Sequence, residues 1–221
     1  MCNRYRPARA EVIEAQWQLK PTGRLWKPGI GPWGEGPFIR ATNGEPELVV
    51  GLWALIGDHD KKAINRPRMT NNARWESVAS LRTYKGPWSR SQRCVIPAES
   101  YDEPNWESGK NEWWSFRRAD AQPWHLAGLW NTWTDPETGE VHESYSMITM
   151  NCDAHPLLRR FHKPELHLPA DQQDKRSVVA IDLADMRTWL TGDVDEAASL
   201  IRLPEASVFD AGPSAATKPG V

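Results

Sequence analysis

Five short runs rich in β-branched and aromatic residues limit the folds that this chain can adopt. Such runs are typical of strands with one or both faces buried. They predict strands at residues 47–56, 93–98, 125–133, 144–150 and 177–181. The runs do not alternate regularly with helices as in a parallel α/β protein, so we expect a curled sheet that is mostly antiparallel or mixed.

Helical patterns are fewer and lie between the strands. Residues 72–81 can begin at Asn72 as the N-cap, residues 183–190 follow Asp182, and residues 194–201 follow Asp193. Side chains of Asn and Asp accept hydrogen bonds from the first free N–H groups of a helix, which makes all three starts chemically reasonable. Strands and helices together predict the α+β class with peripheral helices.

The length of 221 residues suits one domain with insertions. Two segments rich in turn-forming residues, 21–38 and 163–175, are expected to be loops. We expect the domain to cover residues 1–208 and residues 209–221 to form a disordered tail. No internal repeat is visible.

The composition is that of a soluble protein, with a mean hydropathy of −0.65. No apolar run approaches the roughly 20 residues that a membrane helix needs, and the start lacks a secretory signal, so we expect a cytoplasmic protein without a membrane partner. Cys2, Cys94 and Cys152 are an odd number and fit a reducing compartment. The absence of a CxxC pair excludes a zinc ribbon.

A net charge of −2 gives no general argument for nucleic-acid binding. Basic residues nevertheless cluster at 4–9, 61–68, 89–93 and 158–163. These clusters could line an electrostatic groove or be ordinary solvated surfaces, and the sequence leaves both open. Most of the 13 tryptophans should pack in the core or at its rim, and a few near basic segments could stack on bases.

The sequence begins MCNRYRP, with a cysteine directly after the initiator methionine. Cysteine is small enough to permit removal of Met1 by methionine aminopeptidase, which would give Cys2 a free α-amine beside its thiol. An α-amine has a pKa of about 7.8, so far more of it is neutral at pH 7 than of a lysine. The amine can add to an aldehyde, and the thiol can then close a thiazolidine ring. Taken alone, a cysteine at position 2 is more commonly just a small residue with no function.

Two further segments combine polar side chains with an expected element. In TNNARWES, Asn72 offers a donor and an acceptor and Arg74 could meet a phosphate, although an ordinary N-cap is the simpler interpretation. In RCVIPAESYDEP a buried strand leads into Glu99, Asp102 and Glu103. A carboxylate at such a strand end can have a raised pKa suited to proton transfer, whereas surface acids in a loop are more common.

The segment MNCDAHPLLRRFHKP holds the last group of reactive side chains. Cys152, His155, His162 and His167 match no familiar zinc spacing, so we expect no metal and no cofactor. A single histidine used as an acid or a base is more plausible.

In this order, the segments resemble the SRAP family, the SOS-response-associated peptidase fold of abasic-site sensors. The matching motifs are MCNRY, LWALIG, NARWE, RCVIPAESYDE and AGLWNTW, followed by a late histidine before RSVVAI. They span about residues 1–190. The resemblance implies a barrel-like sheet in a single domain.

The resemblance also implies a function, the covalent capture of abasic sites in single-stranded DNA during the DNA damage response. Cys2 would be the nucleophile after loss of Met1 and would trap the sugar aldehyde as a thiazolidine. Asn72 would hold the sugar or the terminal amine. Glu103 matches the carboxylate of the family's Phe-Tyr-Glu turn and would transfer protons.

The late histidine is harder to match, because the family has it directly before Asp-Arg-Met-Pro. Aligning RSVVAI with that strand makes residues 163–175 an insertion and implies that His162 is the catalytic histidine. His155 and His167 are the alternatives.

The resemblance further implies that Arg4 and Arg74 hold backbone phosphates. Pro104 stands where the family has a tryptophan after the catalytic glutamate, and Trp106 could replace that ring in stacking on a base. Other departures from the family motifs are Asn3, Gly57 and Ser100. They indicate a divergent branch and weaken the expected DNA geometry more than the chemistry.

Two other functions remain open at this point. The first is a thiol peptidase, or a lyase-type or self-processing activity, that uses Cys2 and His162 as a dyad. The second is a nucleic-acid-binding module without catalysis, in which Cys2 has no role. The leading hypothesis is a crosslinking protein that acts as a monomer on abasic single-stranded DNA.

Overall fold

The structure is a computed structural model that describes residues 1–19, 23–64 and 68–214. Its strands in the described residues are β1 Tyr5–Pro7, β2 Glu35–Thr42, β3 Glu45–Trp53, β4 Asn72–Arg74, β5 Arg93–Asn105, β6 Glu112–Arg118, β7 Trp124–Thr134, β8 Val141–Asn151, β9 Arg176–Val178 and β10 Phe209–Pro213. The α-helices are α1 Ala10–Trp17, α2 Lys85–Ser89, α3 Met186–Thr191 and α4 Val194–Ser199. Short 3₁₀ turns include η1 Trp75–Ser77, η2 Leu158–Arg160, η3 Ala170–Gln172 and η4 Leu183–Asp185.

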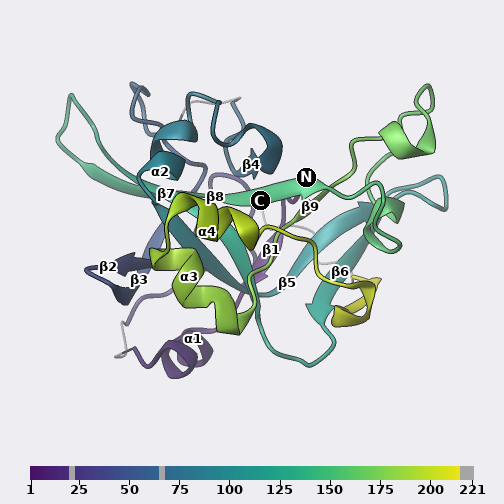
Figure 1. The fold of residues 1–221 in the computed structure, drawn as a ribbon, viewed down its shortest axis with the longest axis horizontal. Helices are drawn as coiled ribbons and strands as arrows, with labels where there is room; N and C mark the ends of the chain where they lie inside the picture. Colours follow the sequence, from purple (N-terminus) through teal and green to yellow (C-terminus); the bar gives the residue numbers. More distant parts are fainter. Residues whose placement is uncertain (20–22, 65–67, 215–221) are drawn as a thin grey trace.

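Within the described residues, five strands close a mixed barrel (Figure 1). β2 pairs antiparallel with β3, β3 parallel with β8, and β8 antiparallel with β7. β7 and β2 both pair antiparallel with the first half of β5, which completes the ring. The predicted α+β class with a curled, mixed sheet is therefore confirmed.

The long strand β5 belongs to two parts of the sheet. Residues 93–98 lie in the barrel wall beside β7, whereas residues 101–105 continue beyond it and pair with β6. β1 pairs with residues 98–101, where the two parts of β5 meet, and β10 extends the sheet beyond β6. Near the end of β8, β4 pairs with one edge of that strand and β9 with the opposite edge, and Thr149 is paired with both. The start of the outer half of β5 thus lies between the N-terminal strand and β6.

Alternation along the strands divides the core in two. Cys94 and Ile96 belong to a cluster that also includes Phe38 and Tyr145, inside the barrel. Val95, between them, belongs to a second cluster that contains buried residues of all four α-helices. Each barrel strand is therefore buried on both faces, which explains the nearly continuous apolar runs in the sequence.

Two of the three expected helices are present. α4 begins at Asp193 with a capping box, in which Asp193 and Glu196 each accept a hydrogen bond from the other's backbone N–H. The helical stretch after Asp182 comprises η4 and α3, but the Asp182 side chain pairs with Arg202 rather than capping the helix.

The prediction of a helix at 72–81 is wrong. Asn72–Arg74 form β4, which pairs in parallel with β8, and only the 3₁₀ turn η1 follows. Asn72 is consequently not an N-cap. The open edge of β8 provides backbone partners over several residues, whereas a helix here would have to satisfy its own ends.

Other elements lie where loops were expected. β2 begins at Glu35 and forms a hairpin with β3, so the expected loop at 21–38 ends earlier, and part of it lies outside the described residues. Phe209–Pro213 form β10 rather than the start of a disordered tail, while 215–221 lie outside the described residues. None of the helices in the part of the chain that the structure describes is long and apolar enough to span a membrane.

Candidate active site

The first residues of the chain are built into the sheet. β1 pairs with residues 98–101 of β5, with Tyr5 opposite Tyr101, and the N–H of Asp102 donates to the carbonyl of Arg4 at 2.9 Å. Tyr5 is buried and its hydroxyl lies 2.6 Å from that of Tyr145. As a result Cys2, three residues before Tyr5, is 0% exposed and has a fixed position.

Two asparagine side chains hold the backbone of Cys2. The Nδ2 atoms of Asn71 and Asn72 donate to the carbonyl oxygen of Cys2 at 3.2 and 2.6 Å. Asn71 is itself fixed, because its backbone carbonyl accepts from the N–H of Met147 at 2.9 Å. Asn72 was expected in the site from the sequence, and Asn71 was not, although the pair of adjacent asparagines was visible.

The thiol of Cys2 faces an apolar environment. Its Sγ lies 3.5 Å from the carbonyl oxygen of Arg4, to which the thiol can donate. Burial, and then the negative charge of Glu103, raise the pKa of the Cys2 thiol well above its ordinary value. The sulfur is therefore a neutral thiol at pH 7 and not a resting thiolate.

Glu103 lies on the outer half of β5 and is 2% exposed. Burial raises its pKa to about 7, opposed by the charge of the chain's amino group and assisted by that of Asp102. Neither carboxylate oxygen forms a hydrogen bond with another described residue. Its near neighbour is His162, whose Nε2 lies 3.4 Å from Oε2 of Glu103.

His162 lies beside the amino group at the start of the chain. The Met1 nitrogen is 3.3 Å from the imidazole, and the ring's Nε2 is 2.9 Å from the carbonyl oxygen of Arg176. The amino nitrogen lies 3.3 Å from both Nδ1 and Nε2. Because a carbonyl oxygen can only accept, Nε2 carries the proton and Nδ1 is the unprotonated ring nitrogen. Burial and then the amino-group charge lower the pKa of His162 to about 3. The imidazole is neutral at pH 7, so its contact with Glu103 is not an ion pair.

The two alternative histidines lie elsewhere. His155 accepts the backbone N–H of Leu158 at Nδ1 and lies 2.9 Å from the carbonyl of Pro204 through Nε2, which makes it a structural link. His167 is exposed and has Glu165 4.0 Å away. Of the three candidates, the structure brings only His162 to the start of the chain.

The acidic residues next to Glu103 point away from it. Successive side chains of a strand face opposite sides, and the Asp102 carboxylate lies 3.0 Å from Nε of Arg4. Glu99 is exposed and lies 3.8 Å from Arg9.

The three residues expected to contact DNA have partners within the protein. Arg4 pairs with Asp102, and Arg74 pairs with Asp174 at 2.8 Å. The indole of Trp106 has the ammonium of Lys163 at 5.4 Å from its ring centre. Arg74 and Asp174 are about half exposed, so a phosphate can compete with the carboxylate for the guanidinium.

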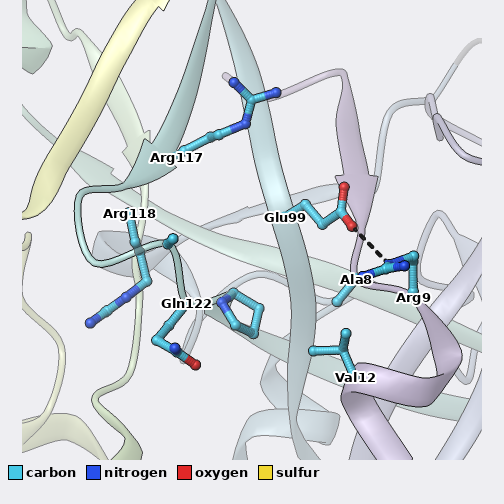
Figure 2. A pocket seen from close by; sticks show the side chains of 9 residues that line it. Ala8, Arg9, Val12, Glu99, Arg117, Arg118 and Gln122 are labelled. Carbon is cyan, nitrogen blue, oxygen red and sulfur yellow. Dashed lines mark ion pairs between the residues drawn. The ribbon is translucent and has the colours of Figure 1, made fainter.

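A cavity of about 240 Å³ lies away from these residues, between α1 and the β5–β6 part of the sheet (Figure 2). It is lined by Arg9, Glu99 and Arg117 among others, and by neither Cys2 nor His162.

The described residues contain no group of three His, Cys, Asp or Glu that could bind a metal ion. Cys152 is also buried, and burial together with the charge of Glu103 raises the pKa of its thiol to about 12.

A family model described as SOS response associated peptidase (SRAP) matches residues 1–213. The chain belongs to the SRAP family. A structure of a Bordetella bronchiseptica protein aligns with 97% of this chain and 100% of its own at 30% identity and a TM-score of 0.86. A Bacteroides thetaiotaomicron protein, 20% identical with 95% and 90% of the two chains covered, shares the fold at a TM-score of 0.75.

The chain is also similar to a protein of Gallus gallus named abasic site processing protein HMCES. The two proteins are 25% identical over an alignment of 151 residues, and the match covers 55% of this chain and 44% of the relative. The matched part is therefore less than half of that protein.

Proposed function

We propose that this protein processes abasic sites in single-stranded DNA by forming a covalent crosslink through Cys2 after Met1 is removed. The observation that carries the proposal is the convergence of the amino terminus and His162 with the buried residues Cys2 and Glu103. The name of the HMCES relative supports the same substrate class.

Loss of Met1 is required for two reasons. It turns the amide nitrogen of Cys2 into an amine, and it clears the space beside His162 that Met1 fills. The sugar aldehyde must occupy this space in order to react with the new amine. The two asparagines that hold the Cys2 carbonyl would keep Cys2 in place while Met1 is lost and the sugar aldehyde takes its space.

The reaction joins one aldehyde to one amine and one thiol and releases one water. The neutral amine of Cys2 attacks the aldehyde carbon of the ring-opened sugar, and the carbinolamine loses water to give an imine. The sulfur then adds to the imine carbon, and the thiol proton finishes on the ring nitrogen of the thiazolidine. Because the amine and thiol belong to one residue, ring closure needs no further encounter.

Glu103 is the main proton-transfer group, and His162 assists it. With a pKa raised to about 7, Glu103 is protonated in a large fraction of molecules and can donate to the leaving hydroxyl, while its carboxylate form can take a proton from the attacking amine. His162, with its pKa lowered to about 3, stays neutral and is a hydrogen-bond acceptor at Nδ1. The carboxyl group, whose pKa lies near the working pH, therefore serves as both acid and base.

The peptidase alternative fits the site less well. A thiol nucleophile activated by histidine needs a lowered thiol pKa, whereas burial raises that of Cys2. His162, with its pKa lowered to about 3, is also a weak base for removing the thiol proton. The site therefore favours amine chemistry over a thiolate–imidazolium dyad.

A denaturing gel tests the proposal. Protein incubated with single-stranded DNA that carries one abasic site should give a band that resists SDS, and Cys2→Ala should abolish it. Cys94→Ala is the matched control, because Cys94 is an equally buried thiol inside the barrel. An undiminished band in Cys2→Ala would refute the proposal, and cleavage of a fluorogenic peptide that depends on Cys2 would favour the peptidase.

A further inference from the structure

His162 has an unusual backbone conformation. Its φ angle is 67°, in the left-handed region that residues with a side chain rarely adopt. Such a conformation persists only where the surroundings enforce it, and it occurs preferentially at functional sites. At His162, contacts of the backbone N–H and carbonyl groups enforce this conformation.

Residues on both sides of His162 fix its backbone. Its N–H donates to the carbonyl of Pro104 at 2.7 Å, next to Glu103 on β5. Its own carbonyl accepts from the ammonium of Lys175 at 2.7 Å. The first bond ties His162 to the strand that carries Glu103, and the second ties it to the residue before β9.

Lys175 closes the insertion that separates His162 from β9. Asp174, directly before it, is also left-handed with a φ angle of 52°. The segment 163–174 thus leaves the sheet through one left-handed residue and returns through another. The ammonium of Lys175 joins these two ends across the base of the loop.

The position of Lys175 is itself determined. Its N–H donates to the carboxylate of Asp153 at 2.8 Å, and its carbonyl accepts from Cys152 at 2.8 Å. The residue is 6% exposed, although lysine is rarely buried. Burial lowers its pKa, opposed by the charges of Asp153, Cys152 and Glu165. A buried ammonium aimed at one backbone carbonyl is a costly contact that a neutral residue could replace if only stability mattered.

We propose that Lys175 is a positioning residue for the reaction at Cys2. It holds the His162 backbone so that Nε2 reaches the Arg176 carbonyl and the ring lies beside the start of the chain. Its positive charge also disfavours protonation of the imidazole, together with that of the amino group, while Glu103 is the acid facing the ring. This inference rests on the proposed function, since it assigns a role within the same site.

Two variants test the contact, one that removes the hydrogen bond and the charge together and one that keeps both. Lys175→Met keeps much of the chain length and removes both the hydrogen bond and the charge, whereas Lys175→Arg keeps a cation that can still donate. We expect Lys175→Met to slow crosslinking about tenfold, as expected for a displaced catalytic group, and Lys175→Arg to recover most of the rate. Lys110→Met, at the exposed β5–β6 turn, is the control.

A second readout does not depend on activity. Titration of the His162 ring by ¹⁵N NMR, assigned with His162→Ala, should give a higher pKa in Lys175→Met than in the wild type and an unchanged pKa in Lys110→Met. The rate–pH profile of crosslinking should shift in the same direction. If Lys175→Met does not fold, Lys175→Gln, which can still donate but carries no charge, should show the raised His162 pKa.

The outcomes distinguish this inference from the proposed function. A wild-type protein that forms no crosslink refutes the function, whatever Lys175 does. A wild type that reacts, with Lys175→Met equal to it in rate, pH profile and His162 titration, overturns the role of Lys175 and leaves the function standing. A loss of rate in Lys175→Arg as large as in Lys175→Met, without any change in the His162 titration, also contradicts the inference.

Discussion

At the scale of single residues, Glu103 makes the most specific prediction about pH. Its acid form donates the proton that releases water, and burial raises its pKa to about 7. The rate of crosslinking should therefore fall as the pH rises above about 7. Glu103→Gln should be about 100-fold slower and should lose this dependence, which stopped-flow or quenched assays across pH 6–9 would measure. An unchanged profile in Glu103→Gln would assign the proton transfer to another group.

The same residue makes a prediction about stability. A carboxyl group whose pKa is raised on folding favours the folded state below its unfolded pKa of 4.5, and this advantage is lost as the pH rises through about 7. Glu103→Gln should therefore melt at a higher temperature than the wild type at pH 8, and the difference should vanish or reverse near pH 4. A melting-temperature difference that does not vary with pH would contradict the assigned burial effect.

Arg74 and Asp174 predict how DNA binding responds to charge. Asp174 pairs with the guanidinium at 2.8 Å, where a phosphate would bind in the proposed complex. Asp174→Asn should tighten binding of undamaged single-stranded DNA about threefold and steepen its salt dependence. Asp171→Asn, an exposed acid on the same insertion, should change affinity less. Fluorescence anisotropy at several salt concentrations measures both, and weaker binding by Asp174→Asn would argue against this path for the strand.

Sequence motifs predicted part of this site and missed the rest for a physical reason. Cys2 and Glu103 lie within motifs, and the alignment of RSVVAI points to His162, so the sequence alone predicts these three residues. The roles of Asn71 and Lys175 arise from contacts between segments far apart in the chain, with Asn71 bonded to Cys2 and Lys175 to His162. No local pattern encodes such contacts.

At the scale of elements, short strands that depend on contacts with distant segments are likewise not predicted from the sequence. The apolar runs of β3, β5, β7 and β8 are long enough to be found from the sequence. β4 and β10 have three and five residues and exist because a neighbouring strand offers an edge. The segment beginning at Asn72 was consequently mistaken for a helix, and the one beginning at Phe209 for a tail.

The attachment of β1 predicts that a change outside the site will alter the reaction. A Cβ added at Gly36 would lie 2.3 Å from the Tyr5 hydroxyl and 2.4 Å from that of Tyr145. Gly36→Ala should destabilise the protein by about 1–3 kcal/mol and slow crosslinking, because Cys2 lies three residues before β1 and is positioned by it. Gly212→Ala, whose Cβ would meet nothing within 4 Å, should do neither. Thermal melts and gel rates measure both, and equal behaviour of the two variants would show that β1 is not held in this way.

At the scale of the whole molecule, one strand connects the fold to the chemistry. The inner half of β5 is part of the barrel, residues 98–101 pair with β1, and the outer half carries Glu103. His162 is tied to the same strand through the Pro104 carbonyl. The amine, the acid and the imidazole are therefore positioned from one rigid element, which suits a reaction that depends on their mutual geometry.

The mass of the crosslinked product tests this account most directly. The proposed reaction predicts a mass equal to that of the protein without Met1, plus the oligonucleotide, minus one water, with fragmentation placing the sugar on Cys2. An adduct that retains Met1, or one that maps to a lysine, would contradict it.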